Sequence, residues 1–430
     1  MSGEVAVGPA QASLRGTLRV PGDKSIGHRA LLFSALAEGT TTVRGLSSGE
    51  DVRSTRRCLE TMGTVIRDDG ELVVVHGKGG DFTQPCTPLD CGNSGTTMRL
   101  LAGILAGREI DATLDGDASL RRRPMRRIAE PLRTMGALIE LREDGVAPIR
   151  VRGSSSLRGI AYELPMPSAQ LKSALLLAAL GARGTTKLGG ALRSRDHTER
   201  MLPIFAGALR AQNGTIVLDG PQRLRAPENE IQIPGDLSSA AYWIAAASII
   251  PDSRLEVEDV GLNPSRLGFV DVLRRMGATI EIHQQRTVPE PSGTILVRGS
   301  ALRGTTVEAA EIPALIDELP LLAVVAAFAE GTTIVHGAEE LRLKESDRID
   351  AVIRNGRAMG MDIEGYPDGF AVHGPRALRG ADVDAMDDHR IAMAFAVASL
   401  GASGTTRIHG AQSVAISYPE FFSILETLRG

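Results

Sequence analysis

Nearly unbroken runs of Ala, Leu, Ile and Val recur six times along the chain, each after a polar, turn-like start. The runs begin near Pro21, Cys91, Pro167, Pro234, Pro313 and Asp387. Runs that are apolar on every side are typical of buried helices. A short strand follows each run, and four of these strands begin with Gly-Thr-Thr, at residues 39–41, 184–186, 331–333 and 404–406.

A second helix follows each strand and often closes on Met-Gly, and two strands of alternating polarity complete the unit. The repeat length of roughly 65 to 80 residues is too long for a short solenoid repeat. The pattern therefore predicts six strand–helix–strand–helix–strand–strand units, an α/β fold with three units in each of two domains. The domains are expected at residues 21–233 and at 1–20 together with 234–430. The sixth unit lacks its last strands, which SLRGTLRV at residues 13–20 could supply.

Composition narrows the class of protein. The 430 residues include 48 Gly and only 3% aromatics, so the cores must be built from aliphatic side chains. A net charge of −4 argues against a nucleic-acid partner. No apolar run reaches the ~18 residues of a membrane span, and the start does not resemble a signal peptide. Three cysteines without metal-ligand spacing, and no ATP, NAD or metal motif, predict a cytoplasmic protein without a cofactor.

The polar starts of the six apolar runs carry the candidate chemistry. Ser, Asp and Asn at these positions are explained by helix capping alone. Capping does not explain four cations there, because positive charge opposes the dipole at a helix N-terminus. These four are Lys24, Arg29, Lys172 and Arg390. A bound anion resolves the conflict. The pattern predicts a small phosphorylated or carboxylated ligand, held in a cleft between the two domains.

Three further segments add cations. Arg123 precedes Pro124 at an expected helix start, and Arg195 follows the Gly-Thr-Thr strand of the third unit, at residues 184–186. In LKESDR we expect Lys344 and Arg348 on one helix face, four residues apart, with Glu345 among them as a group that could move protons. The alternative for the segments around Arg123 and Lys344 is an exposed, solvated turn.

At this point the chain resembles the EPSP synthase family of enolpyruvyl transferases, and more closely its second bacterial class. The resemblance covers residues 14–430. It rests on PGDKSIGHRALL, GNSGTTMRLL, DGDASLRRRPM, PSAQLKSALLLA, RDHTERML, IPGDLSSAAYW, IDELP, LKESDRI and DDHRIAMAFA. It implies a two-domain inside-out α/β barrel of six βαβαββ units, whose interdomain cleft is faced by helix N-termini and closes on substrate.

The resemblance also implies a reaction: phosphoenolpyruvate and shikimate 3-phosphate give 5-enolpyruvylshikimate 3-phosphate and phosphate. It implies that Asp317 accepts the 5-hydroxyl proton, that Glu345 exchanges protons at the methylene carbon, and that Lys344 neutralises charge beside it. The residues implied to hold shikimate 3-phosphate are Lys24, Ser25, Arg29, Ser168, the backbone of Ala169, Gln170, Arg195, Asp317 and Lys344. Those implied to hold phosphoenolpyruvate are Lys24, Asn93, Gly95, Thr96, Arg123, Gln170, Arg348 and Arg390. No cofactor is implied, and a monomer is expected.

Two positions depart from the family pattern. Ser94 stands where many members have Ala, and Ile416 replaces a lysine that some members carry near the C-terminus. Gly95 is present, which leaves room for the herbicide glyphosate, so we expect glyphosate to compete with phosphoenolpyruvate.

Three alternatives are kept in view. A sister enzyme transfers enolpyruvate to UDP-N-acetylglucosamine, but Ala118 stands where that enzyme's loop has a cysteine. A non-catalytic anion-binding protein could keep the fold, although Lys24, Asp317, Glu345 and Arg390 are all present. A nucleic-acid-binding repeat protein is disfavoured by the net charge and the few aromatics.

Overall fold

Two compact domains make up the chain in this computed structural model, which describes residues 3–430. The central domain is Gly22–Ile233, and the terminal domain contains both chain ends, residues 3–21 and Pro234–Gly430. Each has its own apolar core. Pro21, expected at the start of the central domain, groups with the terminal domain, where its carbonyl accepts a 2.8 Å hydrogen bond from the Asp236 N–H.

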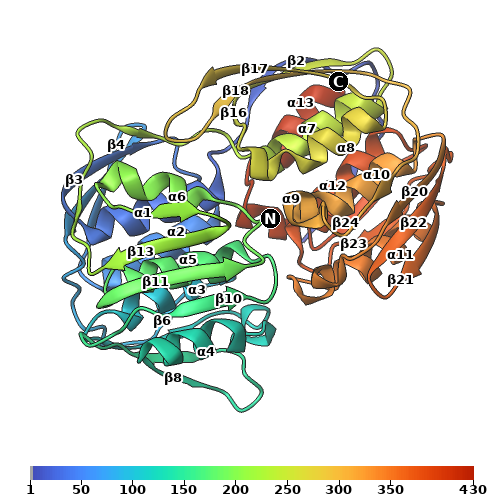
Figure 1. Ribbon diagram of the computed structural model, residues 1–430. Helices are drawn as coiled ribbons and strands as arrows, with labels where there is room; N and C mark the ends of the chain where they lie inside the picture. The colour runs from blue at the N-terminus through green and yellow to red at the C-terminus, as the bar shows by residue number, and fades with distance from the viewer. Residues whose placement is uncertain (1–2) are drawn as a thin grey trace. The chain divides into compact units, whose positions relative to one another are not determined.

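Three helices that are buried along nearly their whole length form the interior of each domain (Figure 1). In the central domain these are α1 (Lys24–Leu36), α3 (Gly95–Ala106) and α5 (Ala169–Ala179). In the terminal domain they are α7 (Leu237–Ile249), α10 (Leu319–Ala326) and α12 (His389–Leu400). The six predicted buried helices are thereby confirmed. Small residues let them approach closely: a Cβ added at Gly103 of α3 would lie 2.2 Å from the Ala174 carbonyl oxygen of α5.

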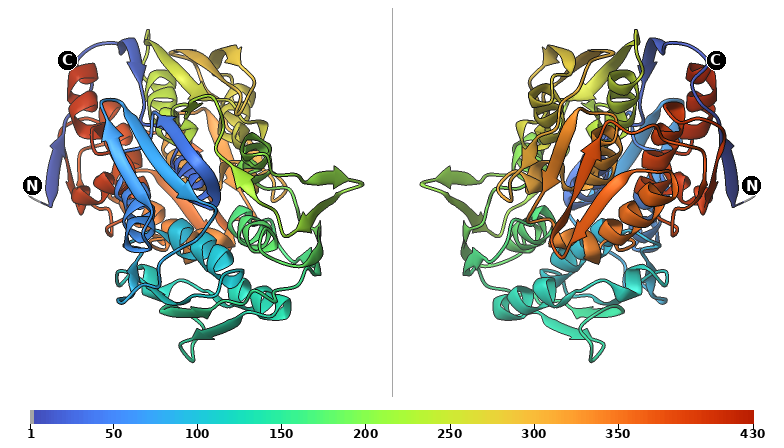
Figure 2. Two further views of the ribbon diagram at one scale, coloured as in Figure 1. Left: turned by 90° about the vertical axis from the view of Figure 1, so that its left-hand side faces the viewer. Right: turned by 90° about the vertical axis from the view of Figure 1, so that its right-hand side faces the viewer.

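Six small sheets lie outside these helices, one for each repeat (Figures 1 and 2). In the central domain, the sheet of the first repeat comprises β14 (Leu224–Arg225), β3 (Ala37–Arg44), β5 (Leu72–Lys78) and β4 (Val65–Asp69), with β15 (Ile231–Gln232) also on β3. The second comprises β6 (Leu89–Asp90), β7 (Asp111–Asp115), β9 (Ile149–Arg152) and β8 (Leu138–Leu141). The third comprises β10 (Ala161–Leu164), β11 (Gly184–Gly190), β13 (Thr215–Gly220) and β12 (Arg210–Gln212).

The terminal domain repeats this arrangement. Its first sheet comprises β2 (Arg15–Arg19), β16 (Arg254–Gly261), β18 (Ser292–Arg298) and β17 (Thr279–Arg286). Its second comprises β19 (Thr306–Val307), β20 (Gly331–Val335), β22 (Gly369–Gly374) and β21 (Asp362–Tyr366). Its third comprises β23 (Asp382–Asp384), β24 (Thr406–His409) and β1 (Glu4–Val7). In all six sheets the first two strands are parallel, and the remaining neighbours are antiparallel except β15, which is parallel to β3.

Further helices, less completely buried, connect the strands. Four of them end at Met-Gly as the sequence predicts: α2 (Glu50–Thr61), α4 (Arg126–Met135), α8 (Gly268–Arg275) and α11 (Arg348–Ala358). The glycine takes a left-handed φ of 87° to 110° in each, which a side chain would strain. The others are α6 (His197–Met201), α9 (Ile312–Leu315) and α13 (Phe421–Arg429). No helix in residues 3–430 is both long enough and apolar enough to cross a membrane.

The N-terminal segment completes two sheets rather than one. Residues 13–20 were expected to finish the sixth repeat, and this expectation is wrong: β2 pairs in parallel with β16 and starts the fourth repeat. The sixth repeat is completed by β1, which pairs antiparallel with β24 and places Val5 opposite Ile408. A segment distant in sequence also completes the sheet of the first repeat, because its parallel strands β14 and β15 come from the end of the central domain.

Candidate active site

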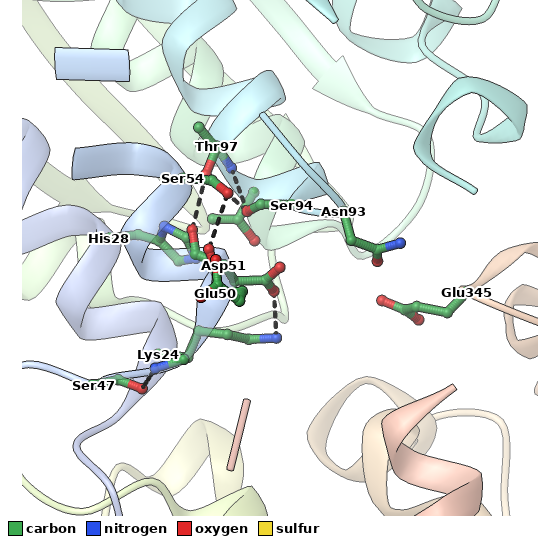
Figure 3. Close-up of polar contacts among 12 residues, drawn as sticks. Lys24, His28, Ser47, Glu50, Asp51, Ser54, Asn93, Ser94, Thr97 and Glu345 are labelled. Atoms are coloured by element: carbon green, nitrogen blue, oxygen red, sulfur yellow. Dashed lines mark hydrogen bonds and ion pairs between the residues drawn. The ribbon is translucent and has the colours of Figure 1, made fainter. Parts of the chain in front are cut away.

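Lys24 is the first residue of α1, where a cation is electrostatically unfavourable. Its ammonium lies 2.8 Å from a carboxylate oxygen of Asp51 in the first turn of α2 (Figure 3). Asp51 thus offsets part of the cost, and about a sixth of the Lys24 side chain (17%) remains exposed for a ligand. Asp23 caps the same helix by accepting a 3.0 Å hydrogen bond from the Ile26 N–H.

Arg29, one turn further along α1, lies inside the domain at 3% exposure. Its guanidinium donates to the Ser25 carbonyl at 2.8 Å, to the Thr198 hydroxyl of α6 at 2.7 Å and to the Ser173 hydroxyl of α5 at 2.6 Å. These contacts join the three helices α1, α5 and α6 at one side chain.

A chain of four buried side chains leads from α1 to the start of α3 (Figure 3). His28 Nδ1 lies 2.7 Å from the Thr55 hydroxyl of α2, which lies 2.7 Å from the Thr97 hydroxyl. Thr97 donates at 2.8 Å to Ser94, and Ser94 caps α3 by accepting the Thr97 N–H at 3.1 Å. Burial, aided by the charges of Lys24 and Arg29, lowers the pKa of His28 well below 6.5. His28 is therefore a neutral member of the chain.

The loop before α3 is held by charged neighbours. The Asn93 side-chain oxygen accepts a 2.6 Å hydrogen bond from Arg123, and its NH2 group donates at 2.6 Å to Asp117. The two contacts fix the orientation of the amide. The structure thus brings together the predicted phosphoenolpyruvate ligands Asn93 and Arg123.

Gln170, at the start of α5, joins the same region. Its side-chain oxygen accepts a 2.6 Å hydrogen bond from Arg99, and its NH2 group donates at 3.0 Å to Thr96. A Cβ added at Gly95 would lie 2.6 Å from Arg99 Nη1 and 3.2 Å from Arg123 Nη1, so both guanidiniums reach the first turn of α3. The sequence reasoning missed Arg99, although an arginine within an apolar helix was a usable signal.

The third helix start and the loop after β11 complete this group of central-domain residues. Ser168 caps α5 by accepting the Leu171 N–H at 3.3 Å, and Ala169 is the first helical residue. Arg195 lies between β11 and α6. Lys172 was expected to serve an anion, but the ammonium instead contacts Glu199 at 2.7 Å and is 2% exposed.

In the terminal domain, Asp317 is surrounded by the predicted cations. Its carboxylate lies 3.4 Å from Arg348 Nη1, 3.6 Å from Lys344 Nζ and 3.8 Å from Arg390 Nη2. It sits in a single 3-10 turn, Ile316–Glu318, directly before α10. Three of these residues come from the fifth repeat, and Arg390 comes from the sixth, so the fold brings the ends of two repeats together.

Arg348 is the centre of this group and is almost completely buried. It contacts Asp388 at 2.8 Å and Glu345 at 2.7 Å as well as Asp317. Desolvation opposes its charge, but Asp388 and Glu345 outweigh it and raise the pKa of Arg348. Desolvation likewise acts to raise the pKa of Asp388, and Arg348 reverses this, so the pKa is lowered. One guanidinium thus positions both predicted acid–base carboxylates, Asp317 and Glu345.

Lys344 does not share a helix face with Arg348, so that expectation is wrong. The 3-10 turn Glu339–Leu343 ends before Lys344, which is extended, and α11 begins at Arg348. The reason is the cap: Asp347 accepts the Asp350 N–H at 3.0 Å and starts the helix there. Desolvation lowers the pKa of Lys344 although Asp317 opposes the shift, and 27% of its side chain is exposed.

Arg390 links this group to Glu318, which was not among the predicted site residues. Its guanidinium lies 3.4 Å from Glu318, which also accepts a hydrogen bond from Ser238 of α7. Arg266 in turn donates to Ser238 at 2.7 Å and to Asp236 at 2.9 Å. Desolvation opposes the charge of Arg390, but Asp317 and other acids raise its pKa well above the ordinary value.

The two groups of residues differ in charge. In the terminal domain, the five named carboxylates outnumber the four named cations by one: Asp236, Asp317, Glu318, Glu345 and Asp388 against Arg266, Lys344, Arg348 and Arg390. In the central domain, the named cations outnumber the named carboxylates: Lys24, Arg29, Arg99, Arg123, Lys172 and Arg195 against Asp23, Asp51, Asp117 and Glu199. The central domain is therefore the more attractive one for polyanions. Residues 3–430 contain no group of three or more His, Cys, Asp or Glu side chains placed to hold a metal ion.

Comparison with known proteins decides the family. Residues 9–425 match the sequence model of EPSP synthase (3-phosphoshikimate 1-carboxyvinyltransferase). The chain belongs to the EPSP synthase family. It is 49% identical to the 3-phosphoshikimate 1-carboxyvinyltransferase of Synechococcus sp. strain JA-3-3Ab, over 99% of this chain and 96% of that protein. An EPSP synthase structure from Acinetobacter baumannii superposes with a TM-score of 0.87 at 40% identity, covering 99% of this chain and 98% of that one.

These matches confirm the resemblance, the fold class and the transferase activity predicted from the sequence. Fold alone would not have decided the reaction. The enolpyruvyl transferase NikO from Streptomyces tendae also superposes, with a TM-score of 0.77 over 99% of this chain and 97% of that one, but at only 19% identity, which shows the fold alone. The reaction follows from the curated relatives, which are 49% identical and named 3-phosphoshikimate 1-carboxyvinyltransferase.

Proposed function

We propose that the two groups of residues described above carry out one addition–elimination. The enolpyruvyl group of phosphoenolpyruvate moves to the 5-hydroxyl of shikimate 3-phosphate, and phosphate leaves. In the addition, the hydroxyl oxygen bonds to C2 of phosphoenolpyruvate while C3 gains a proton. In the elimination, the bond from C2 to the phosphate oxygen breaks and C3 loses a proton, which restores the double bond.

In this proposal the central domain supplies most of the anion-binding groups. Ser25, Arg29, Ser168, Ala169, Gln170 and Arg195 hold shikimate 3-phosphate. Asn93, Gly95, Thr96 and Arg123 hold phosphoenolpyruvate together with Gln170, and Lys24 contacts both substrates. The support is the excess of cations there and the capped starts of α1, α3 and α5, whose N–H groups favour anions.

The terminal domain supplies the proton transfers. Asp317 accepts the proton of the 5-hydroxyl, and Glu345 gives a proton to C3 and takes one back. Lys344 neutralises charge beside them, and Arg348 and Arg390 bind phosphoenolpyruvate. The observation that carries this assignment is that Arg348 contacts both carboxylates, at 3.4 Å and 2.7 Å. Groups fixed in this way need no rearrangement during the reaction.

Replacing Glu345 tests this assignment. Phosphate release by the wild-type chain should require both substrates. Glu345→Gln should lower kcat about 10²- to 10⁴-fold, the usual contribution of a general acid–base. Binding of shikimate 3-phosphate, measured by calorimetry, should stay within about twofold because the residues proposed to bind it are unchanged.

Glu339→Gln is the matched control, since Glu339 is exposed and lies in the 3-10 turn just before Lys344. It should keep wild-type turnover. If Glu345→Gln turns over as fast as this control, Glu345 does not move the protons. The monomeric state and the cytoplasmic location expected from the sequence stay predictions.

A further inference from the structure

Lys172 is a cation that the proposed reaction does not use. It lies in the first turn of α5, where its charge opposes the helix dipole, and its side chain is 2% exposed. A buried ammonium is costly unless it is paired and hydrogen-bonded. The partners of Lys172 therefore identify the part of the fold that its buried ammonium holds in place.

All its polar partners lie on one segment. Lys172 Nζ is 2.7 Å from a carboxylate oxygen of Glu199 and 3.4 Å from the carbonyl oxygens of Leu192 and Ser194. An ammonium has three N–H donors, and these three oxygens match them. The second carboxylate oxygen of Glu199 has no hydrogen-bond partner among residues 3–430, so Lys172 is the group that compensates this charge.

The partners enclose the loop that carries Arg195. Ser194 directly precedes Arg195, and Glu199 lies in the first turn of α6, four residues after it. The far side of the loop is held separately, because the Thr198 hydroxyl accepts from Arg29 and lies 2.7 Å from the Ser173 hydroxyl. The backbone around Arg195 is thus tied to α5 on one side and to α1 and α5 on the other.

We propose that Lys172 is a positioning residue for Arg195: by holding the carbonyls of Leu192 and Ser194 and the carboxylate of Glu199, it fixes the loop from which Arg195 binds shikimate 3-phosphate. The inference rests on the proposed role of Arg195 in that binding. Lys172 touches no substrate and acts only through the loop. Its loss should weaken shikimate 3-phosphate binding and leave phosphoenolpyruvate binding nearly unchanged.

The test compares variants by their affinity for shikimate 3-phosphate, measured by calorimetry without phosphoenolpyruvate. Lys172→Met keeps the length of the side chain but leaves the buried Glu199 charge unpaired, which destabilises the fold. The decisive variant is therefore Lys172→Met with Glu199→Gln, which removes both charges. We expect its Kd for shikimate 3-phosphate to rise about tenfold, and its KM for phosphoenolpyruvate to stay within about twofold.

A double-mutant cycle with Arg195→Ala shows whether the effect passes through Arg195. Arg195→Ala should itself weaken binding, and adding the Lys172/Glu199 changes should then have little further effect. Leu188→Ala is the control for stability alone, because Leu188 is a buried residue of β11 in the same repeat. It should lower the melting temperature and leave the Kd unchanged.

Four results would overturn the proposal: an unchanged Kd in the Lys172/Glu199 variant, an unchanged Kd in Arg195→Ala, the same loss with and without Arg195, or an equal loss in Leu188→Ala. A failure of the proposed reaction is seen separately, as absence of phosphate release by the wild-type chain. The calorimetric cycle does not depend on turnover, so it tests the role of Lys172 whether or not the proposed reaction takes place.

Discussion

Two lysines in the first turns of buried helices looked alike in the sequence and serve different purposes. Lys24 pairs with Asp51 and stays partly exposed, whereas Lys172 pairs with Glu199 inside the domain. In both pairs the acid lies 27 residues later, in the first turn of the next helix. Aligning the first repeat with the third would have shown this shared spacing. What the sequence could not show was exposure, which depends on how the loop before α6 packs.

His28 gives a prediction about pH and stability. Burial keeps it neutral in the folded protein, while the unfolded chain binds a proton below about pH 6.5. The unfolded state therefore gains protons that the folded state does not, and this group costs stability as the pH falls below 6.5. His28→Gln keeps hydrogen-bonding groups but does not titrate. Between pH 6.5 and 5 it should reduce the pH dependence of the free energy of unfolding by up to about 1.4 kcal/mol per pH unit.

Urea unfolding of both proteins across this range measures the slopes. Between pH 7 and 8, where His28 is neutral in both states, the curves should run parallel, which serves as the internal reference. Identical slopes below pH 6.5 would mean that His28 takes up its proton in the folded protein.

At the scale of elements, the sequence predicted the six buried helices and their polar starts because both follow from local pattern. The sequence pattern could not predict side-chain contacts between different helices. Arg99 of α3 reaches Gln170 of α5 across 71 residues, and nothing in the local spacing indicates this pair. The break before α11 was missed for a related reason, since Asp347 could cap a helix or lie within one, and only the fold decides.

The start of α3 gives the prediction at this scale. In Gly95→Ala the new methyl group meets the ends of Arg99 and Arg123, at 2.6 Å and 3.2 Å. Both are flexible side chains, so the helix should persist while the guanidiniums shift. We expect KM for phosphoenolpyruvate to rise about tenfold, as for the loss of one charge-assisted hydrogen bond. Inhibition by glyphosate, which we expect to compete with phosphoenolpyruvate, should weaken in parallel.

Gly103→Ala is the contrasting variant on the same helix. Its methyl group would lie 2.2 Å from the backbone oxygen of Ala174, which cannot move aside as a side chain can. It should therefore cost about 1–3 kcal/mol of stability, as overpacking does, with no selective change in KM. An unchanged KM for phosphoenolpyruvate in Gly95→Ala, or a wild-type chain unaffected by millimolar glyphosate, would contradict these expectations.

At the scale of the molecule, the repeat period predicted the number of units and their division between two domains. It could not predict which sheet each spare strand joins, because pairing between distant segments is decided by the edges that the fold leaves open. Residues 15–19 therefore pair with β16 rather than with the sixth repeat, and Glu4–Val7 takes the place expected for them. The same uncertainty applied to β14 and β15, which return to β3 from the far end of the central domain.

That return has a consequence for folding. Because β14 and β15 supply the parallel strands of the first sheet, the segment Gly22–Ile233 contains every strand of its three sheets and its own core. The fragment should therefore fold alone, with a single cooperative urea transition followed by circular dichroism. It keeps Lys24, Arg29 and Arg195 but lacks Asp317 and Glu345. It should bind shikimate 3-phosphate in calorimetry, lose that binding in Arg195→Ala, and release no phosphate.

A shorter fragment that ends before Leu224 is the control. It lacks β14 and β15 and should be markedly less stable. If the two fragments unfold alike, the returning strands do not stabilise the domain, and a longer fragment without a cooperative transition would show that the domain depends on the rest of the chain.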